Sequence, residues 1–289
     1  AERIDQLRGE LAAGGIRVPI HFYLSDEWFT PDGATAIAIP FYLAHPRLEK
    51  LEDAQMFEAE GAEHEWGMRI LRHEAGHAFH SFATHRLPYV WQRSSGHEAA
   101  ELASMSMELL AGRYLARPDG YYTVAEAAQA QVEHLEDVLY ALPHIACVDA
   151  FQHWIYTSGK GGDRDARDAA WLEIRQRFEP SVDWSGLAPE RVARWLRQSH
   201  IFTSPFYYIE YGLAQLGALQ VWRDSLRDHP AAVARYKQAL ALGGTVPLPE
   251  MYRAAGVRLV FDAPTMAELV GLVEERIEAL RSMLRTGEV

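Results

Sequence analysis

The sequence has little cysteine, less positive than negative charge, and no long apolar run. Cys147 is the only cysteine in 289 residues, which excludes a disulfide within the chain and any metal site built from thiolates alone. No run of about 18 or more apolar residues is present, so no segment has the pattern of a membrane-spanning helix. No signal-peptide pattern occurs at Ala1, and cytoplasmic localisation is therefore the default expectation.

Acidic residues outnumber basic ones. The chain has 40 Asp and Glu against 28 Lys and Arg, a formal net charge of −12. This balance argues against nucleic acid and against an anionic membrane surface as partners. With 48% hydrophobic and 24% charged residues, the composition is that of a globular chain long enough for one large domain or two lobes around a cleft. No feature of the sequence indicates an oligomeric state.

The pattern of residue types predicts a short β region followed by helices. Within residues 1–45, the runs RVPIHFYLS and TAIAIPFYL are β-branched and aromatic, and the turn signal TPDG separates them. Pro40 favours an edge position for the second run. From Pro46 onward, beginning with PRLEKLEDAQMFEAEG, the sequence is typical of helices. The expected fold is mainly α with a small N-terminal β region, and residues 1–289 are expected to form a single domain.

Further helices are predicted from hydrophobic periodicity and from residues that start or end helices. One helix is expected to begin at a Ser94 or Ser95 cap, and another at Pro205 with Ser204 as its cap. The segment LGGTVPLPE (242–250) is expected to be a loop. The expected helices cover 66–83, about 96–116, 123–157, 164–178, 188–198, 205–227, 230–242 and 264–286.

The segment GMRILRHEAGHAFHSF (67–82) carries the strongest chemical signal. Its HEAGH stretch matches the pattern His-Glu-x-x-His, with His73 and His77 four residues apart. On a helix this spacing places both imidazoles on one face, where they can bind one metal ion. Glu74 lies beside them and can act as a general base. Zinc is the expected ion for two imidazoles, one carboxylate and an open position. The alternative for this segment alone is histidines that are hydrogen-bonded within a core.

The third metal ligand is expected on the next helix. In GHEAAELASMSMELLAGRYL, an otherwise apolar helix carries one polar stripe, made of His97, Glu101, Ser104 and Glu108. A buried polar stripe needs partners, and a metal site would supply them. We therefore expect Glu101 to be the ligand and Glu108 to orient a ligating imidazole. An exposed salt bridge is the alternative for Glu108, and Glu98 is more typical of a first helical turn.

A later aromatic segment, QSHIFTSPFYYIEYGLAQLGALQVW, is a third candidate part of the site. Tyr208 and Tyr211 are at helical spacing, and Tyr207 lies one turn before Tyr211. Tyrosine hydroxyls in a cleft can donate hydrogen bonds to an oxyanion, as can a loop histidine such as His200. The alternative is an aromatic stripe that belongs to the core, and Tyr207 could take the role of Tyr208.

Taken together and in this order, these segments resemble the oligoendopeptidase F and thimet oligopeptidase family of zinc metallopeptidases. The similarity runs from about Ile70 to about Leu280. It rests on HEAGHAFHSF, EAAELASMSMELL, VDAFQHWIYT, HIFTSPFYYIEYGLAQLGALQVW and YKQALALGGTVPLPEMYRAAG. Residues 1–69 depart from the family's usual sequence before the motif, so its preference for short peptides is not carried over.

The resemblance implies a zincin-like, mainly helical catalytic domain around a cleft, with one zinc ion per chain. It implies three metal ligands, His73, His77 and Glu101, with Glu74 as the base. It also implies that three residues contact the oxyanion or the substrate: His200, Tyr208 and Tyr211.

The expected function is zinc-dependent hydrolysis of internal peptide bonds by a metal-activated water, with peptides as the partner. One alternative is a zinc-containing module that binds peptides or proteins without catalysis, although such a module has no need of a base such as Glu74. A non-peptide amidase is a second alternative, which substrate assays would separate. A third is a metal-free helical protein, which one bound zinc per chain would exclude.

Overall fold

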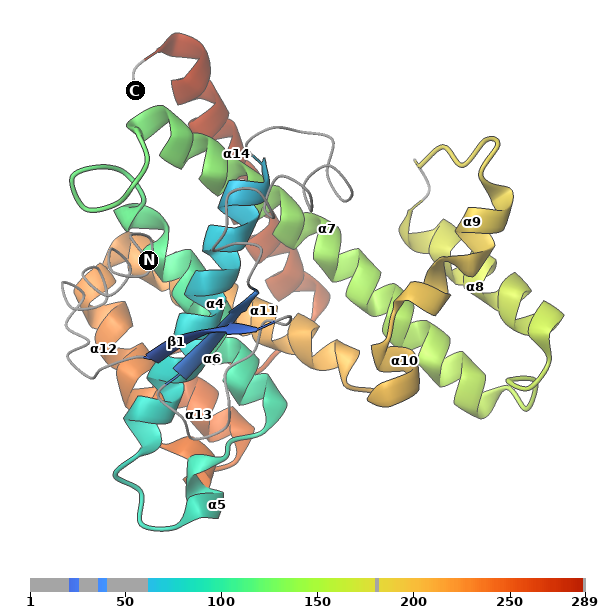
Figure 1. Cartoon of the computed structure of the whole chain (residues 1–289), viewed down its shortest axis with the longest axis horizontal. Coiled ribbons are helices and arrows are strands. Elements are labelled where there is room, and N and C mark those ends of the chain that lie inside the picture. Colours follow the sequence, from blue (N-terminus) through green and yellow to red (C-terminus); the bar gives the residue numbers. More distant parts are fainter. Residues whose placement is uncertain (1–20, 26–35, 41–61, 180–181, 288–289) are drawn as a thin grey trace. The chain divides into compact units, whose positions relative to one another are not determined.

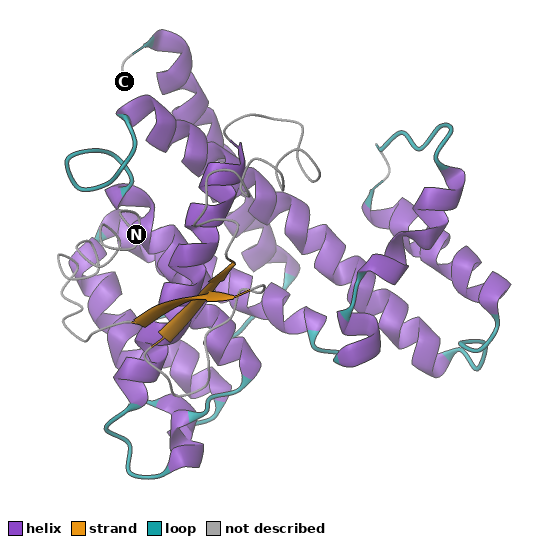
Figure 2. Cartoon of the chain, viewed as in Figure 1, coloured by secondary structure: helices purple, strands orange, loops and turns teal. Residues whose placement is uncertain are grey.

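The computed structural model describes residues 21–25, 36–40, 62–179 and 182–287. Figure 2 shows that most of these residues are helical. The chain forms two compact units: unit 1 comprises residues 1–132 and 214–289, and unit 2 comprises residues 133–213. The expectation of a single catalytic domain stays a prediction. Among the described helices, none is both long and apolar enough to cross a membrane.

Unit 1 contains the histidine-rich helix and most of the later helices (Figure 1). Within it, α4 (Ala62–Thr84) and α6 (His97–Ala111) have an extensive contact, and α12 (His229–Leu240) packs against both. Its elements are β1 (His21–Ser25), β2 (Ala36–Pro40), α4 (Ala62–Thr84), α5 (Val90–Arg93), α6 (His97–Ala111), η1 (Gly112–Tyr114), the first part of α7 (Val124–Thr157), the last part of α11 (Tyr208–Arg227), α12 (His229–Leu240), η3 (Gly243–Thr245), α13 (Leu248–Ala254) and α14 (Ala263–Thr286).

The contact between α4 and α6 depends on a glycine inside the histidine motif. A Cβ added to Gly76 would lie 2.5 Å from the Cα of Ser104 and 2.9 Å from the carbonyl oxygen of Ala103. Only a residue without a side chain allows the two backbones to approach this closely. Tyr236 of α12 donates a buried hydrogen bond of 2.7 Å to the same carbonyl of Ala103. This packing brings the polar face of α6 next to the motif on α4.

Unit 2 has its own hydrophobic core. Phe151 of α7 is fully buried and makes edge-to-face contacts with Trp171 and Trp195, at centroid distances of 5.2 and 5.5 Å. Cys147, one turn before Phe151, is buried and unpaired, and burial raises the pKa of its thiol. The elements of this unit are the rest of α7, α8 (Arg164–Phe178), α9 (Ala188–Ala193), η2 (Arg194–Arg197), α10 (His200–Thr203) and the first residues of α11.

The expected N-terminal β region is wrong, because the fold of the described chain is helical. In the range 1–45 the described residues form only two strands of five residues each, β1 and β2. The strands pair in parallel, from His21 opposite Ala36 to Ser25 opposite Pro40. A tight turn joins antiparallel strands, whereas parallel strands need a longer crossover. The turn signal TPDG lies outside the described residues. The helix expected from Pro46 to Gly61 lies outside the described residues.

Two helix starts differ from the expected ones. The cap of α6 is Gly96, not Ser94 or Ser95. The later helix, α11, begins at Tyr208 instead of Pro205. Pro205 instead occupies the second position of a turn, in which the amide of Tyr207 donates to the carbonyl of Ser204 at 3.1 Å. The third residue, Phe206, has φ of 64°. Proline followed by a positive φ is the arrangement of a type II turn.

The expected loop 242–250 is also partly helical. Gly243–Thr245 forms a 3₁₀ turn, and α13 begins at Leu248 with Pro249 in its first turn. Proline is tolerated there because the first amides of a helix have no partner within the helix. Two prolines and two glycines in nine residues favoured a loop, but the second proline is at a helix start.

Candidate functional site

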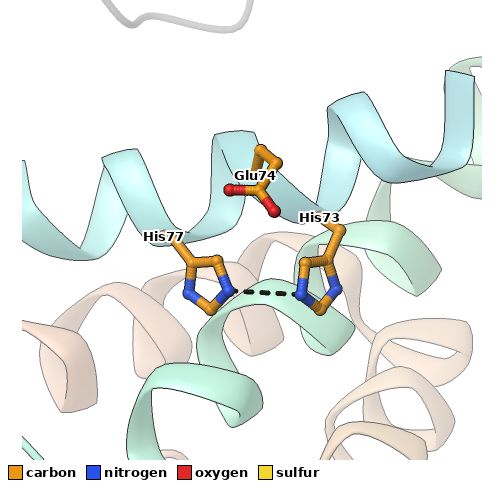
Figure 3. A group of neighbouring side chains, drawn as sticks. All are labelled: His73, Glu74 and His77. Carbon is orange, nitrogen blue, oxygen red and sulfur yellow. Dashed lines mark hydrogen bonds between the residues drawn. The ribbon is translucent and has the colours of Figure 1, made fainter. Parts of the chain in front are cut away.

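The two histidines of the motif lie side by side on α4. His73 and His77 are four residues apart, and their Nε2 atoms are 3.2 Å apart. Figure 3 shows both rings on the same side of the helix, with the Glu74 side chain beside them. One ligand atom from each of these three residues lies within 4.8 Å of the others. The helical spacing therefore produces the face that the sequence predicted.

A carboxylate from α6 faces the imidazole pair. The Oε2 atom of Glu101 lies 3.3 Å from Nε2 of His73 and 3.8 Å from Nε2 of His77. Glu101 is buried, with 5% of its surface exposed. The hydroxyl of Ser104 donates to the same Oε2 atom at 3.1 Å, which holds the carboxylate in place. Two imidazole nitrogens and one carboxylate oxygen thus converge from two helices.

This donor set fits a zinc ion. Two donors at about 2.0–2.1 Å from an ion, separated by a tetrahedral angle, lie about 3.3–3.4 Å apart. The three observed separations, 3.2, 3.3 and 3.8 Å, are close to that value. Two imidazoles and one carboxylate are also the ligand types of a common class of catalytic zinc site. Glu74 lies beside the three donors and is buried, with 8% of its surface exposed.

Glu108 contacts the far side of His73. Its Oε1 atom accepts a hydrogen bond from Nδ1 of His73 at 2.7 Å. A carboxylate that accepts the Nδ1 proton leaves the Nε2 atom to face Glu101 and His77. This is the contact that the polar stripe on α6 predicted for Glu108. His97, at the start of the stripe, is exposed in the first turn of α6.

Burial and charge act in opposite directions on the histidines of this helix. Burial lowers the pKa of His73, but the hydrogen bonds and charges of Glu101 and Glu108 outweigh it and raise the pKa to about 10. The pKa of His77 is lowered, by burial first and then by the charge of His73. Burial lowers the pKa of His80 to about 4, and its Nε2 atom lies 3.4 Å from the Ser95 hydroxyl. His80 is therefore a neutral core residue.

The residues expected from the aromatic segment gather in unit 2. His200 begins α10, and its Nε2 atom lies 3.5 Å from the Tyr211 hydroxyl. The rings of Tyr207 and Tyr208 lie 5.6 and 5.1 Å from the His200 ring. Burial raises the pKa of Tyr208. All three tyrosines therefore surround one histidine, and their roles toward a substrate stay predictions.

Sequence reasoning missed a polar partner of His200. The side-chain amide of Gln198 lies 2.8 Å from Nδ1 of His200, and its oxygen lies 3.3 Å from Nε2 of His144 on α7. His144 and Gln198 are 54 residues apart, so no local periodicity connects them. Gln198 stands two residues before His200, and this short spacing was the only local signal.

Comparisons with known proteins extend over most of the described chain. The model of peptidase family M3 matches residues 64–270. The oligoendopeptidase F homologue of Borreliella burgdorferi is 24% identical over 221 residues, which cover 75% of this chain and 36% of that protein.

Solved structures of similar proteins show the same fold. A structure of PZ peptidase A with an inhibitor has 32% identity and a TM-score of 0.67. A structure of an oligoendopeptidase F has 32% identity and a TM-score of 0.68, and each of the two matches covers 74% of this chain and 37% of the other. An oligoendopeptidase F from Bacillus anthracis has 26% identity and a TM-score of 0.60, and the match covers 74% of this chain and 34% of that one. The chain thus spans little more than a third of the length of these relatives.

Proposed function

Because the chain belongs to peptidase family M3, we propose that it is a zinc-dependent endopeptidase that hydrolyses internal peptide bonds. One observation carries the proposal: two imidazoles and a carboxylate converge within 3.2–3.8 Å of one another, with a second carboxylate beside them. The relatives that are oligoendopeptidases support peptides as the substrate class. We propose one zinc ion per chain, held by three ligands: His73, His77 and Glu101.

Zinc in such a site would supply a Lewis acid that polarises the scissile carbonyl and acidifies water. The protein's own part in the proton transfer falls to Glu74. A carboxylate beside the three donors would take a proton from the attacking water and deliver it to the leaving amine nitrogen. Ser104 and Glu108 would keep Glu101 and His73 in their orientations through the hydrogen bonds described above.

We assign the stabilisation of negative charge on the substrate oxygen to His200, Tyr208 and Tyr211. Imidazole N–H and phenol O–H groups are hydrogen-bond donors of the type that stabilises an oxyanion. Their gathering around one histidine in unit 2 supports a common role. Tyr207 stacks on the same ring and is the alternative to Tyr208.

The first experiment combines zinc analysis with a cleavage assay. The purified chain should contain one zinc ion and should cleave an internally quenched peptide library at internal bonds. A chelator should abolish the cleavage, and added zinc should restore it. Zinc without cleavage would favour a peptide- or protein-binding module. Cleavage of non-peptide amides alone would favour an amidase, and a chain that binds no zinc would overturn the proposal.

A further inference from the structure

A line of hydrogen-bonded side chains in unit 2 ends at His200. Arg175 of α8 contacts Nδ1 of His144 through its Nη1 atom at 2.9 Å. Nε2 of His144 lies 3.3 Å from Oε1 of Gln198, and Nε2 of Gln198 lies 2.8 Å from Nδ1 of His200. Nε2 of His200 faces the hydroxyl of Tyr211 at 3.5 Å. Each side chain uses two different atoms, one toward each neighbour.

The direction of these hydrogen bonds is set at the buried end. A guanidinium group has only donors, so Nδ1 of His144 must accept the hydrogen bond from Arg175. An imidazole that accepts at Nδ1 is neutral and carries its proton on Nε2. Burial lowers the pKa of His144, and the charge of Arg175 acts in the same direction, which agrees with a neutral ring. His144 therefore donates from Nε2 toward Gln198.

The orientation of the Gln198 amide determines the direction of its hydrogen bond to His200. Because its oxygen accepts from His144, its amide nitrogen is the atom that donates to Nδ1 of His200. An accepting Nδ1 atom requires the proton of His200 to be on Nε2. The Nε2–H group then points toward Tyr211 at a distance typical of a weak hydrogen bond. A stronger acceptor can replace this bond at low cost.

The surroundings hold this line in place. Arg175 is 2% exposed, pairs with Glu179, and lies over the face of Trp171 in the core of unit 2. His144 lies one turn before Cys147 on the buried face of α7. The Tyr208 ring contacts His144 and His200, at centroid distances of 5.7 and 5.1 Å. Arg175, which is held in the core, is thus connected to the half-buried His200 through His144 and Gln198.

We propose that Gln198 and His144 are positioning residues that keep His200 in the tautomer protonated at Nε2, so that His200 presents a hydrogen-bond donor to the substrate oxygen. The catalytic part of this inference rests on the proposed function. The tautomer itself does not, because it follows from the side chains of unit 2 alone. The two parts are therefore tested by separate measurements.

The tautomer is tested by ¹⁵N NMR of the zinc-loaded protein labelled at histidine. The His200 and His144 signals are assigned from the spectra of the His200→Gln and His144→Gln variants. In the unsubstituted protein, both residues should show a proton bonded to Nε2 and an unprotonated Nδ1. A proton on Nδ1 of His200, or exchange between the two tautomers, would overturn the inference. This readout needs no enzymatic activity, and it needs no change at Gln198.

A variant that replaces the amide of Gln198 by a carboxylate tests its function. Gln198→Glu has the same shape but only acceptors, so the proton of the neutral His200 ring should move from Nε2 to Nδ1, which the same NMR experiment detects. Gln176→Glu is the matched control, because Gln176 is exposed and its oxygen accepts a hydrogen bond from Arg191. An unchanged His200 signal in Gln198→Glu would contradict the role of Gln198.

Steady-state kinetics then separates positioning from folding. Gln198→Glu should lower kcat about 10- to 100-fold with little change in KM, somewhat less than the loss of an oxyanion donor itself. Gln176→Glu should leave both constants unchanged. Equal kcat values for Gln198→Glu and the unsubstituted enzyme would refute the positioning role. If the unsubstituted chain cleaves no peptide, the proposed function fails, and the NMR result alone decides whether the tautomer is fixed.

Discussion

Nδ1 of His73 and Oε1 of Glu108 lie 2.7 Å apart, so a carboxylate on α6 orients an imidazole on α4. We expect Glu108→Gln to keep one zinc per chain but to lower its affinity about 10- to 100-fold, because the carboxylate both orients the ring and strengthens it as a ligand. Competition with a chromophoric chelator measures this affinity. Glu173→Gln, an exposed position on α8, is the charge-matched control. Equal affinities for the two variants would contradict the role of Glu108.

Glu74→Gln should separate metal binding from catalysis. Gln keeps the size of the side chain but cannot take up a proton, so the zinc content should stay at one per chain. The value of kcat should fall about 10²- to 10⁴-fold, the usual contribution of a general base. Elemental analysis and peptide cleavage measure the two properties on one preparation. His73→Ala, by contrast, should lose zinc and activity together. Substantial cleavage by Glu74→Gln would show that the base is another residue.

Gly76→Ala should destabilise the protein through the contact between α4 and α6. The new Cβ would lie 2.5 Å from a backbone atom of Ser104, which cannot rotate away. We expect a loss of about 1–3 kcal/mol in the free energy of unfolding, measured by chemical denaturation of the zinc-free protein. At Gly271 in α14, a new Cβ meets nothing within 4 Å. Gly271→Ala should therefore be neutral or stabilise by up to about 1 kcal/mol. The same loss at both positions would argue against the close contact.

Zinc binding should release a proton from His73. In the metal-free protein Glu101 and Glu108 raise the pKa of His73 to about 10, so the ring is charged at neutral pH. A ligating nitrogen must lose its proton, and the apparent affinity should therefore rise about tenfold per pH unit up to that pKa. The lowered pKa of His77 means that it contributes no proton at neutral pH. Titration calorimetry in buffers of different ionisation enthalpy should show about one proton released per zinc.

The same raised pKa should make the metal-free protein less stable as pH rises, whereas the affinity for zinc increases with pH. A pKa raised from 6.5 stabilises the folded state fully below pH 6.5, and this stabilisation is lost as pH rises toward 10. Zinc-loaded protein has no such proton to lose. Thermal unfolding as a function of pH should therefore show a falling Tm for the metal-free form only. A parallel fall in both forms would contradict the assignment to His73.

The tyrosines around His200 should differ in their effects. Tyr211→Phe removes the hydroxyl that faces Nε2 of His200, and we expect it to lower kcat about 10- to 100-fold if that hydroxyl stabilises the oxyanion. Tyr207→Phe and Tyr208→Phe decide which of these two residues shares that role, because only the one that contacts substrate should reduce kcat. Circular dichroism checks that each variant is folded. No change in kcat for any of the three would remove the tyrosines from the mechanism.

Features that lie along a single helix could be predicted from the sequence. The spacing of His73 and His77 fixes a common face, and the polar stripe of α6 predicts that Glu101 and Glu108 lie near these histidines, as their contacts show. Helix geometry alone decides which residues share a face, so these predictions needed no tertiary information. The family resemblance was confirmed by the match over residues 64–270.

Features that depend on distant contacts could not be predicted. Pro205 has the same φ at a helix start and in a turn, and the difference lies in the positive φ of Phe206. The parallel pairing of β1 and β2 likewise depends on how the chain returns, which the strand sequences do not encode. Arg175 and His144 are 31 residues apart, and no sequence period connects them.

The absence of a side chain at Gly76 has a consequence for how zinc would leave the protein. The three donor atoms come from two helices whose backbones touch at this glycine, so the ion would act as a cross-link between segments 24 residues apart along the chain. Separation of the helices and dissociation of the metal then become one event, and each kilocalorie of metal affinity also opposes local opening. Backbone amides of α4 and α6 should exchange with deuterium together, at a rate that follows the occupancy of zinc.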